Sequence, residues 1–374
     1  MCIIREGVMK AAVLRGFNEP LKLEDVALQD PQAHEVLVKI VATGICHSDL
    51  SVIEGKFLPM LPVVLGHEAA GIVESVGSGV TQVAKGDHVI LSFIPACGFC
   101  GYCSTGRPQL CQEGMQRVMM GAMADGTSRL SVKGESVFHF LGLSSFAEYA
   151  VVHEAAAIKI PDDMPLDKAC LIGCGVMTGV GAAINTAGVK PATTVAVIGC
   201  GGVGLNAIQG SALAGARTIV AVDVLDNKLE MAKRFGATHT VNAKKENALD
   251  RIQAYTEGLG ADYSFEVIGH PDTVALAFDA LRPGGLCVVV GVAPLDAQFI
   301  VTPMALMQEK AMKGCIYGSA RPRVDMPHFI ELYRSGRLKL DELISRTYKL
   351  EQINEAFDAL REGTVARSVI QLAA

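Results

Sequence analysis

Residues 195–204 read VAVIGCGGVG, an apolar run that passes directly into a glycine-rich turn. Gly199, Gly201 and Gly204 stand in G-x-G-x-x-G spacing. Glycines at this spacing let a strand turn tightly into a helix and let a pyrophosphate approach the backbone at the helix N-terminus. A single match also fits an ordinary glycine-rich turn, so the neighbouring segments have to decide between the two interpretations.

Those neighbours favour a dinucleotide site. TIVAVDV at 218–224 and LCVVVGV at 286–292 are buried strands separated by helical stretches, a pattern typical of βαβ units and a parallel sheet. Asp223 follows Gly204 by nineteen residues, where a carboxylate accepts both hydroxyls of an adenosine ribose and disfavours a 2′-phosphate. The sequence therefore predicts NAD rather than NADP. Lys228 is either a second ribose contact or a solvated helix lysine.

The length of 374 residues indicates two domains. Residues 1–175 consist of short β-rich runs punctuated by Gly, Pro and Asp, which predict a folded-over β domain. Residues 176–320 carry the alternating βαβ pattern and should form the NAD-binding domain. We expect residues 321–374, two helical stretches and a last strand, to return to the first domain.

Composition excludes several classes of function. The net charge of -6 at pH 7 gives no reason to expect nucleic acid or an anionic membrane as a partner. The chain has no secretory signal and no run of eighteen apolar residues, so we expect a cytoplasmic protein without a membrane span. Proteins of that compartment rarely form a disulfide framework, so the eleven cysteines point to metal or redox chemistry instead.

Two sets of cysteine and histidine residues suit metal ions. GHEAAGIVESVG at 66–77 offers His67, GICHSDL at 44–50 offers Cys46, and LIGCGV at 171–176 offers Cys174. Three such ligands from separate segments leave the fourth position open, as a catalytic zinc requires. Taken singly, Cys46 and Cys174 are more often inert buried thiols.

Together these motifs resemble the zinc-containing alcohol dehydrogenases of the medium-chain dehydrogenase/reductase family. The resemblance runs from about residue 9 to the C-terminus and includes GICHSD, GHEAAGIVESVG, a four-cysteine loop, LIGCG and GCGGVG in the family's order. It implies an α/β fold: a doubly wound Rossmann parallel sheet plus a β-rich, GroES-like catalytic domain. It also implies reversible oxidation of an alcohol by hydride transfer to NAD.

The four-cysteine loop occupies the lobe at 95–113 and has the spacing C-x2-C-x2-C-x7-C. Cys97, Cys100, Cys103 and Cys111 complete a tetrahedral thiolate site with no open position, which is typical of structural zinc. The same spacing also suits an iron–sulfur cluster. With the three-ligand site, the structural interpretation gives two zinc ions per chain.

The resemblance implies further roles at matching positions. Glu68 would stand behind the catalytic zinc as an occasional ligand, Asp49 would orient the histidine ligand, and Ser48 would accept the alcohol proton. The implied coenzyme contacts, including those from the glycine motif, are His47, Thr178, Gly199, Gly201, Gly202, Val203, Gly204, Asp223, Lys228, Val292 and Arg367. The implied lining of the substrate channel is Ser48, Phe57, Phe93, Leu110, Phe140, Leu141, Val292 and Ile316.

Apart from Ser48, the channel lining is apolar, which favours primary alcohols with an aryl or medium-length alkyl body. Members that oxidise the glutathione–formaldehyde adduct place charged groups where Phe57 and Met115 stand, although Arg117 is nearby. Ser51 replaces a histidine that often passes the alcohol proton to solvent, so we expect oxidation to rise toward alkaline pH.

Other interpretations remain open. A polyol dehydrogenase would need hydrogen-bonding groups in the pocket, and the apolar lining counts against it. A non-catalytic zinc- and nucleotide-binding redox sensor is the other alternative, and the intact metal ligands together with Ser48 and Asp223 count against it. The stretch 112–139 resembles the longer lobe of dimeric members, which favours a homodimer over a tetramer.

Overall fold

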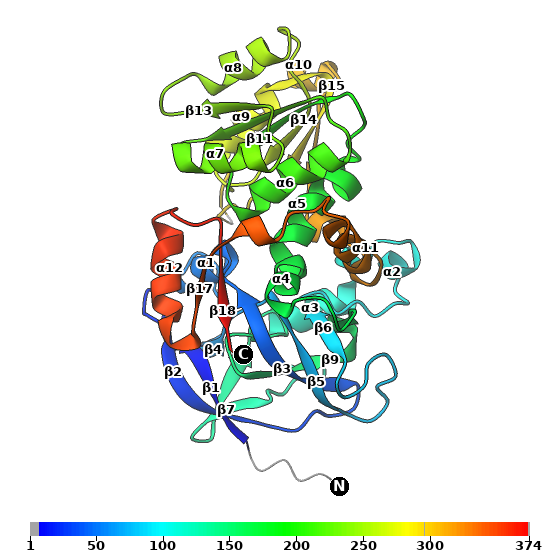
Figure 1. The fold of residues 1–374 in the computed structure, drawn as a ribbon, viewed down its shortest axis with the longest axis vertical. Helices are drawn as coiled ribbons and strands as arrows, with labels where there is room; N and C mark the ends of the chain where they lie inside the picture. Colours follow the sequence, from blue (N-terminus) through cyan, green and yellow to red (C-terminus); the bar gives the residue numbers. More distant parts are fainter. Residues whose placement is uncertain (1–6, 295, 373–374) are drawn as a thin grey trace. The chain divides into compact units, whose positions relative to one another are not determined.

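The computed structural model describes residues 7–294 and 296–372. The chain divides into two compact units (Figure 1). Unit 1 contains residues 1–174, 321–335 and 340–374, and unit 2 contains residues 175–320 and 336–339.

Unit 1 is built from a closed barrel of strands and a second, seven-stranded sheet. The barrel has the strand order β1-β2-β7-β8-β4: β1 (Gly7–Leu14), β2 (Lys22–Leu28), β7 (Leu130–Val132), β8 (Glu135–His139) and β4 (Val63–Val64). The sheet has the order β10-β6-β5-β3-β18-β17, with β9 also paired to β3: β3 (Glu35–Gly44), β5 (Ala69–Val76), β6 (His88–Leu91), β9 (Tyr149–His153), β10 (Ala157–Lys159), β17 (Ile344–Tyr348) and β18 (Arg367–Gln371).

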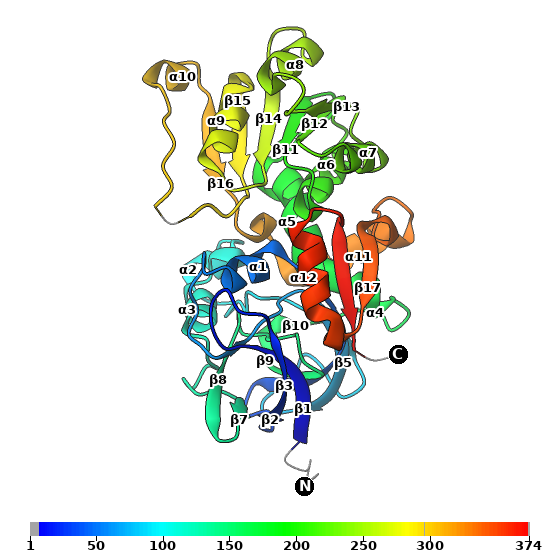
Figure 2. The ribbon, with the colours of Figure 1, turned by 90° about the vertical axis from the view of Figure 1, so that its left-hand side faces the viewer.

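The C-terminal segment completes this unit. Strand β18 pairs antiparallel with β3, and Val369 lies opposite Gly44, two residues before Cys46. Phe357 of α12 (Ile353–Arg361) packs edge-on against Phe146 with ring centroids 5.9 Å apart, inside the same buried cluster. Figure 2 shows α12 and β18 beside the N-terminal strands. The last fifty residues therefore help to fix the backbone that carries Cys46.

The helices of unit 1 are short, and two of them adjoin predicted zinc ligands: α1 begins directly after Cys46, and α4 ends shortly before Cys174. They are α1 (His47–Ile53), α2 (Gly101–Ser104), η1 (Pro108–Leu110), α3 (Gln112–Met120), η2 (Glu154–Ala156), α4 (Leu166–Leu171), α11 (Pro322–Arg334), η6 (Asp341–Leu343), η7 (Leu350–Gln352) and α12.

Unit 2 is a six-stranded parallel sheet in the order β13-β12-β11-β14-β15-β16. The strands are β11 (Thr194–Ile198), β12 (Thr218–Asp223), β13 (His239–Asn242), β14 (Ala261–Glu266), β15 (Leu281–Val289) and β16 (Ala311–Gly314). The helices are α5 (Met177–Gly181), α6 (Gly202–Leu213), α7 (Asp226–Arg234), α8 (Ala248–Tyr255), α9 (Pro271–Asp279) and α10 (Pro303–Met307), with η5 (Tyr317–Ser319) after β16. Helices α6 and α7 cover one face and α9 the other (Figure 1).

All six strands are parallel, but the order in which the chain adds them to the sheet reverses between β11 and β14. In open parallel sheets a ligand binds beyond the carboxyl ends of the strands at the point of reversal. The doubly wound Rossmann sheet and the separate β-rich unit are the fold class that the sequence predicts. The glycine-rich turn follows β11 and therefore lies at the ligand-binding edge.

One helical stretch, Leu166–Ala187, is long and apolar enough to cross a membrane by length and composition, and 83% of its most apolar window is buried within the protein. Such burial is typical of a core helix. The stretch contains two π-helical segments, η3 (Ile172–Val176) and η4 (Ala182–Ala187). Single π turns within α-helices are frequent at functional sites, and Cys174 lies in the first of them.

Candidate active site and structural metal centre

Three side chains from separate segments of unit 1 converge on one point. Cys46 immediately precedes α1, His67 lies between β4 and β5, and Cys174 lies in η3. Their ligand atoms all lie within 4.8 Å of one another, and all three residues are buried. We refer to Cys46, His67 and Cys174 as the three-donor group.

His67 is held in place by a buried carboxylate. Asp49 Oδ1 lies 3.1 Å from His67 Nδ1 and accepts the backbone N–H of Gly66 at 3.0 Å. A hydrogen bond at Nδ1 leaves Nε2 of the ring to face a metal, the usual arrangement for a histidine ligand. Gly66 has φ +93, and a Cβ there would lie 2.6 Å from the backbone nitrogen of Phe146. Position 66 therefore requires glycine, which explains the glycine that precedes His67 in the motif GHEAAGIVESVG.

Glu68 lies beside the three-donor group but outside the set of ligand atoms within 4.8 Å of one another, and its role as an occasional ligand stays a prediction. Its carboxylate is fully buried, packs against Gly44 and lies 3.3 Å from Arg367 Nη1. Burial raises the pKa of Glu68 to about 8, while the Arg367 charge opposes that rise. Arg367 is 4% exposed and also donates to the carbonyl of Ile45. Its expected contact with a pyrophosphate stays a prediction, whereas its pairing with Glu68 is a feature that the sequence did not suggest.

Three phenylalanines form an apolar wall around His67. The rings of Phe93 and Phe140 each meet the imidazole edge-on, with centroids 5.7 Å away. Phe57 in turn meets Phe140 edge-on at 6.4 Å. We refer to Phe57, Phe93 and Phe140 as the aromatic cluster. Its rings exclude water from one side of the three-donor group and offer a surface that suits an apolar ligand.

Ser48 is the polar group next to that wall. Its Oγ lies 3.8 Å from Cys46 Sγ, and the residue is half-buried in the first turn of α1. His47, its neighbour, is exposed. A hydroxyl this close to a candidate metal ligand is placed to receive a proton from a group bound at the open position.

The remaining lining residues are distributed over both units. Leu110 ends η1 in the cysteine lobe, and Leu141 follows Phe140 with φ +50. Val292 and Ile316 belong to unit 2 and are 75% and 37% exposed. The structure therefore brings the aromatic cluster to His67 within unit 1, while the channel role of Leu110, Leu141, Val292 and Ile316 stays a prediction.

The four cysteines at 97, 100, 103 and 111 also converge, with their sulfurs within 4.8 Å of one another. We refer to them as the four-cysteine group. The Cys97–Cys103 and Cys100–Cys111 sulfurs are 3.9 Å apart, and all cysteines in the described part of the chain are free. Cys97, Cys100 and Gly114 donate backbone N–H groups to Cys111 or Cys97 sulfurs at 3.3–3.4 Å. Such bonds stabilise thiolates over thiols.

Both groups fit zinc. Tetrahedral zinc with bonds of about 2.3 Å to sulfur separates two sulfurs by about 3.8 Å, close to the spacing of the four-cysteine group. In the three-donor group, two thiols and one imidazole are the ligand types that zinc prefers when one position stays open. Asp49 Oδ2 is buried without a hydrogen-bond partner among the described residues, and Glu68 makes no hydrogen bond there beyond its ion pair with Arg367. A cation at the three-donor group would favour the ionised form of both carboxyl groups.

The glycine-rich turn of unit 2 has the shape of an anion cradle. Gly199 has φ +100, and a Cβ at Gly204 would lie 1.9 Å from the carbonyl oxygen of Gly199. A Cβ at Gly201 would meet nothing within 4 Å, so space is open beside the backbone there. Gly201 caps α6 without a side-chain hydrogen bond. The first N–H groups of α6, at Gly202 and Val203, therefore face no capping side chain, which fits a pyrophosphate.

The residues predicted to contact the ribose and the nicotinamide all belong to unit 2. Asp223 ends β12 and is 8% exposed; its carboxylate accepts N–H groups of Cys200, Val224 and Leu225 at 2.7–3.1 Å. These bonds fix the carboxylate beside the turn. Lys228 is half-buried in α7. Gly179, the neighbour of Thr178 in the chain, packs against Val203, because a Cβ there would be 2.3 Å from the Val203 carbonyl oxygen; the nicotinamide contact of Thr178 stays a prediction.

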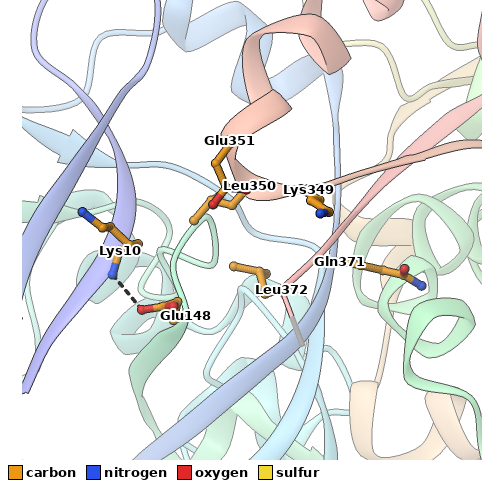
Figure 3. A pocket seen from close by; sticks show the side chains of 7 residues that line it. All are labelled: Lys10, Glu148, Lys349, Leu350, Glu351, Gln371 and Leu372. Atoms are coloured by element: carbon orange, nitrogen blue, oxygen red, sulfur yellow. Dashed lines mark hydrogen bonds between the residues drawn. The ribbon is translucent and has the colours of Figure 1, made fainter. Parts of the chain in front are cut away.

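Two surface cavities of unit 1 lie away from these residues. One has a volume of about 350 Å³ and is lined by Lys10, Glu148, Lys349, Leu350, Glu351, Gln371 and Leu372. In Figure 3 the Glu148 carboxylate accepts the backbone N–H of Lys10, at 2.8 Å. The other, of about 410 Å³, is lined by residues of α12 and by residues 18–20 and 53–54. Neither is lined by a predicted site residue, and their mixed charges indicate ordinary surface grooves.

Comparisons with known proteins agree with this geometry. Residues 32–162 match the family model described as alcohol dehydrogenase GroES-like domain, and residues 202–335 match the model described as zinc-binding dehydrogenase. The chain is 45% identical over 368 residues to an alcohol dehydrogenase class-3 of Drosophila melanogaster, covering 97% of both chains.

Solved structures extend the likeness to the whole fold. An alcohol dehydrogenase zinc-binding domain protein from Burkholderia ambifaria superposes with a TM-score of 0.94 at 37% identity, covering 98% of this chain and 100% of the other. The benzyl alcohol dehydrogenase of Acinetobacter calcoaceticus does so with a TM-score of 0.93 at 36% identity and the same coverage. The resemblance predicted from the motifs is confirmed: the chain belongs to the zinc-dependent alcohol dehydrogenases of the medium-chain dehydrogenase/reductase family.

Proposed function

We propose that this alcohol dehydrogenase oxidises primary alcohols with an aryl or medium-length alkyl body to aldehydes, reversibly, with NAD as hydride acceptor. The observation that carries the proposal is the aromatic cluster, which packs directly against His67 of the three-donor group. An aryl or alkyl body would replace water at these rings at no cost in unpaired polar groups. The similar fold of a benzyl alcohol dehydrogenase supports the same substrate class.

We further propose a division of roles between the two units. Unit 1 would be the catalytic domain, with one zinc at the three-donor group and one at the four-cysteine group, and unit 2 would bind NAD at the turn after β11. Zinc would supply a Lewis acid for the alcohol oxygen, and NAD would supply the hydride acceptor. The chain's own residues do the rest: Asp49 fixes the orientation of His67, and Ser48 Oγ receives the alcohol proton.

A thiol-adduct formaldehyde dehydrogenase on the same scaffold is the second candidate. It is favoured by Arg117 of α3, a cation that could pair with a carboxylate of such an adduct. Two observations count against it. Arg117 is already 3.4 Å from Glu113 of its own helix, and uncharged Phe57 and Met115 stand where adduct-oxidising members carry charge.

Substrate turnover separates the two candidates. NADH formation is measured with benzyl alcohol, hexanol, ethanol, sorbitol and the glutathione–formaldehyde adduct, each before and after chelator treatment. We expect fast, chelator-sensitive turnover of benzyl alcohol and hexanol. Activity confined to the adduct or to sorbitol would overturn the substrate class and leave the zinc chemistry in place.

We also propose that the protein is a cytoplasmic homodimer that joins through unit 2. In support, β16 is an edge strand of the six-stranded sheet and is largely exposed. The preceding segment exposes large apolar side chains, among them Ile300 at 89% and Met307 at 78%. Exposed apolar surface beside an open sheet edge is typical of an interface between copies of a chain. Light scattering of the purified protein tests this, and a monomer at micromolar concentration would contradict it.

A further inference from the structure

We propose that Glu266 is a positioning residue that holds the coenzyme-binding edge of unit 2 in shape, an inference that rests on the proposed NAD site. Glu266 is the last residue of β14 and is fully buried. None of the sequence motifs includes it. A carboxylate is costly to bury unless it is hydrogen-bonded, so its retention at this position indicates a specific task.

The Glu266 side chain accepts hydrogen bonds from the loop that follows β14 and from the start of α9. Its Oε1 accepts the backbone N–H groups of Ile268 at 2.9 Å and Gly269 at 2.8 Å, and the Thr273 hydroxyl at 2.7 Å. Three donors on one carboxylate oxygen form charge-assisted bonds, which are roughly twice as strong as neutral ones. The loop at 267–270 and the start of α9 are therefore tied to the end of β14 through this one atom.

The main chain of Glu266 ties down a second loop. Its carbonyl oxygen accepts the N–H groups of Val290 at 2.8 Å and Gly291 at 3.0 Å, just beyond the end of β15. The two loops also touch each other, because a Cβ at Gly269 would lie 2.4 Å from the Val292 carbonyl oxygen. Val292 is one of the predicted coenzyme contacts. Glu266 thus fixes both sides of a loop pair that presents Val292.

The same loop pair packs against the glycine-rich turn. A Cβ at Gly199 would lie 2.7 Å from the Ile268 side chain, and the Val267 N–H donates to the carbonyl of Ile198 at the end of β11. Strands β11 and β14 are neighbours at the point where the strand order reverses. Glu266 therefore stands at the reversal point itself, where a ligand of this fold binds.

The two carboxylate oxygens predict different effects of substitution. Glu266 Oε2 is buried without a hydrogen-bond partner among the described residues and faces Gly291, where a Cβ would lie 2.6 Å from it. Glutamine keeps the shape and one acceptor for the three donors. Alanine removes the acceptor and leaves two backbone N–H groups and a hydroxyl unsatisfied, so the loop loses its preferred conformation.

Three variants test the proposal on the full-length, zinc-replete protein. The probe is NADH, titrated by its fluorescence, and amide hydrogen exchange is followed at residues 266–273 and 289–293 without coenzyme. We expect Glu266→Ala to raise the NADH dissociation constant at least about tenfold and to speed exchange in both stretches. We expect Glu266→Gln to stay within about threefold of wild type.

Ser264→Ala is the matched control, because Ser264 is equally buried two residues earlier in β14 and its side chain lies beside Cys287 of β15. It should leave the dissociation constant unchanged, which separates loop positioning from disturbance of the core. If Glu266→Ala does not fold, Glu266→Asp replaces it: the shorter side chain cannot reach both loop amides, and we expect a dissociation constant at least about fivefold above that of Glu266→Gln.

The outcomes are distinguishable. Wild-type binding of NADH with an unchanged constant in Glu266→Ala, or equal effects of Glu266→Ala and Ser264→Ala, would overturn this inference and leave the proposed NAD function intact. Failure of the wild-type protein to bind NADH would overturn both.

Discussion

The four-cysteine group takes all its ligands from the fifteen residues between Cys97 and Cys111, whereas the three-donor group takes its ligands from three segments between Cys46 and Cys174. The first is partly exposed and its sulfurs accept N–H groups of its own loop. The second is buried, beside the carboxyl groups of Asp49 and Glu68 and the rings of Phe93 and Phe140. A site whose ligands come from one loop can stabilise that loop. A site whose ligands come from three segments depends on the fold of the whole unit, and it is the one placed to support catalysis.

The largest effect should come from the local group. Cys100→Ser removes one of four thiolates, and structural zinc in small zinc-binding peptides contributes about 10–16 kcal/mol at pH 7. We expect the yield of soluble protein to fall at least about tenfold, measured beside wild type under the same expression conditions. A soluble, stable Cys100→Ser protein that retains both zinc ions would show that the group has no structural role.

Cys46→Ser should have the opposite signature. Cys46 is buried just before α1, where the smaller serine hydroxyl fits, but the three-donor group loses a thiolate, and turnover of benzyl alcohol should fall at least about 1,000-fold, roughly 4 kcal/mol. The melting temperature should change by only a few degrees. Turnover within tenfold of wild type would remove Cys46 from the chemistry.

Asp49→Asn tests how the fold holds the second group. The amide keeps the shape beside His67 and Gly66 but loses the charge that holds the imidazole N–H. Loss of such a partner typically costs 10–100-fold in metal affinity or activity, so we expect zinc retention during dialysis against chelator to fall within that range. Leu50→Val, on the same helix, is the matched control. Equal zinc retention in Asp49→Asn and wild type would contradict the assignment.

His139 offers a contrast to His67, because it is a buried histidine without an acid beside it. Burial, with the Arg129 charge as a second cause, lowers the pKa of His139 to about 4, and its Nε2 accepts the N–H of Arg129. The ring is neutral when folded and binds a proton near pH 6.5 when unfolded. The contribution of His139 to the free energy of unfolding should therefore decrease by about 3 kcal/mol as the pH falls from about 6.5 to 4, and this contribution should stay level below that range.

Urea unfolding at pH 7.5 and pH 4.5 measures this effect against His139→Gln, whose side-chain oxygen can accept the same N–H. The variant should lose less stability between the two pH values than wild type. Equal losses would mean that His139 does not contribute to the acid sensitivity.

The smallest effect concerns the proton path from Ser48. Ser51 is half-buried in α1 and cannot act as a base, so benzyl alcohol oxidation should rise toward alkaline pH. A histidine at position 51 would accept the proton near neutral pH. We expect Ser51→His to flatten the profile of kcat between pH 6 and 9. An unchanged profile would exclude position 51 from the proton path.

The local features could be predicted from the sequence because each is contained in a short motif. The four cysteines and the turn at 199–204 depend on spacing along one stretch of chain, and Asp223 was predicted as a ribose contact from its distance to that turn, although its hydrogen bond with Cys200 was not. Cys46, His67 and Cys174 show no common spacing, so the three-donor group was predicted from their joint appearance with the glycine-rich unit and from the family resemblance.

Other features were not predictable because they depend on packing between distant segments. The Arg367–Glu68 contact requires β18 to pair with β3, and the bonds from Val290 and Gly291 to the Glu266 carbonyl require the loops after β14 and β15 to meet. Periodicity places Glu266 at the end of a strand but does not reveal which amides its carboxylate accepts. Long-range pairing of this kind leaves no signal within a single stretch of sequence.

The most direct test of the account is the zinc content of three proteins, measured by elemental analysis and set beside their turnover of benzyl alcohol. We predict two zinc ions per chain in wild type, one in Cys46→Ser with turnover lost, and one in the soluble fraction of Cys103→Ser with turnover per remaining folded chain largely retained. If loss of the zinc at the four-cysteine group abolished turnover while Cys46→Ser kept it, the assignment of the two sites would be contradicted.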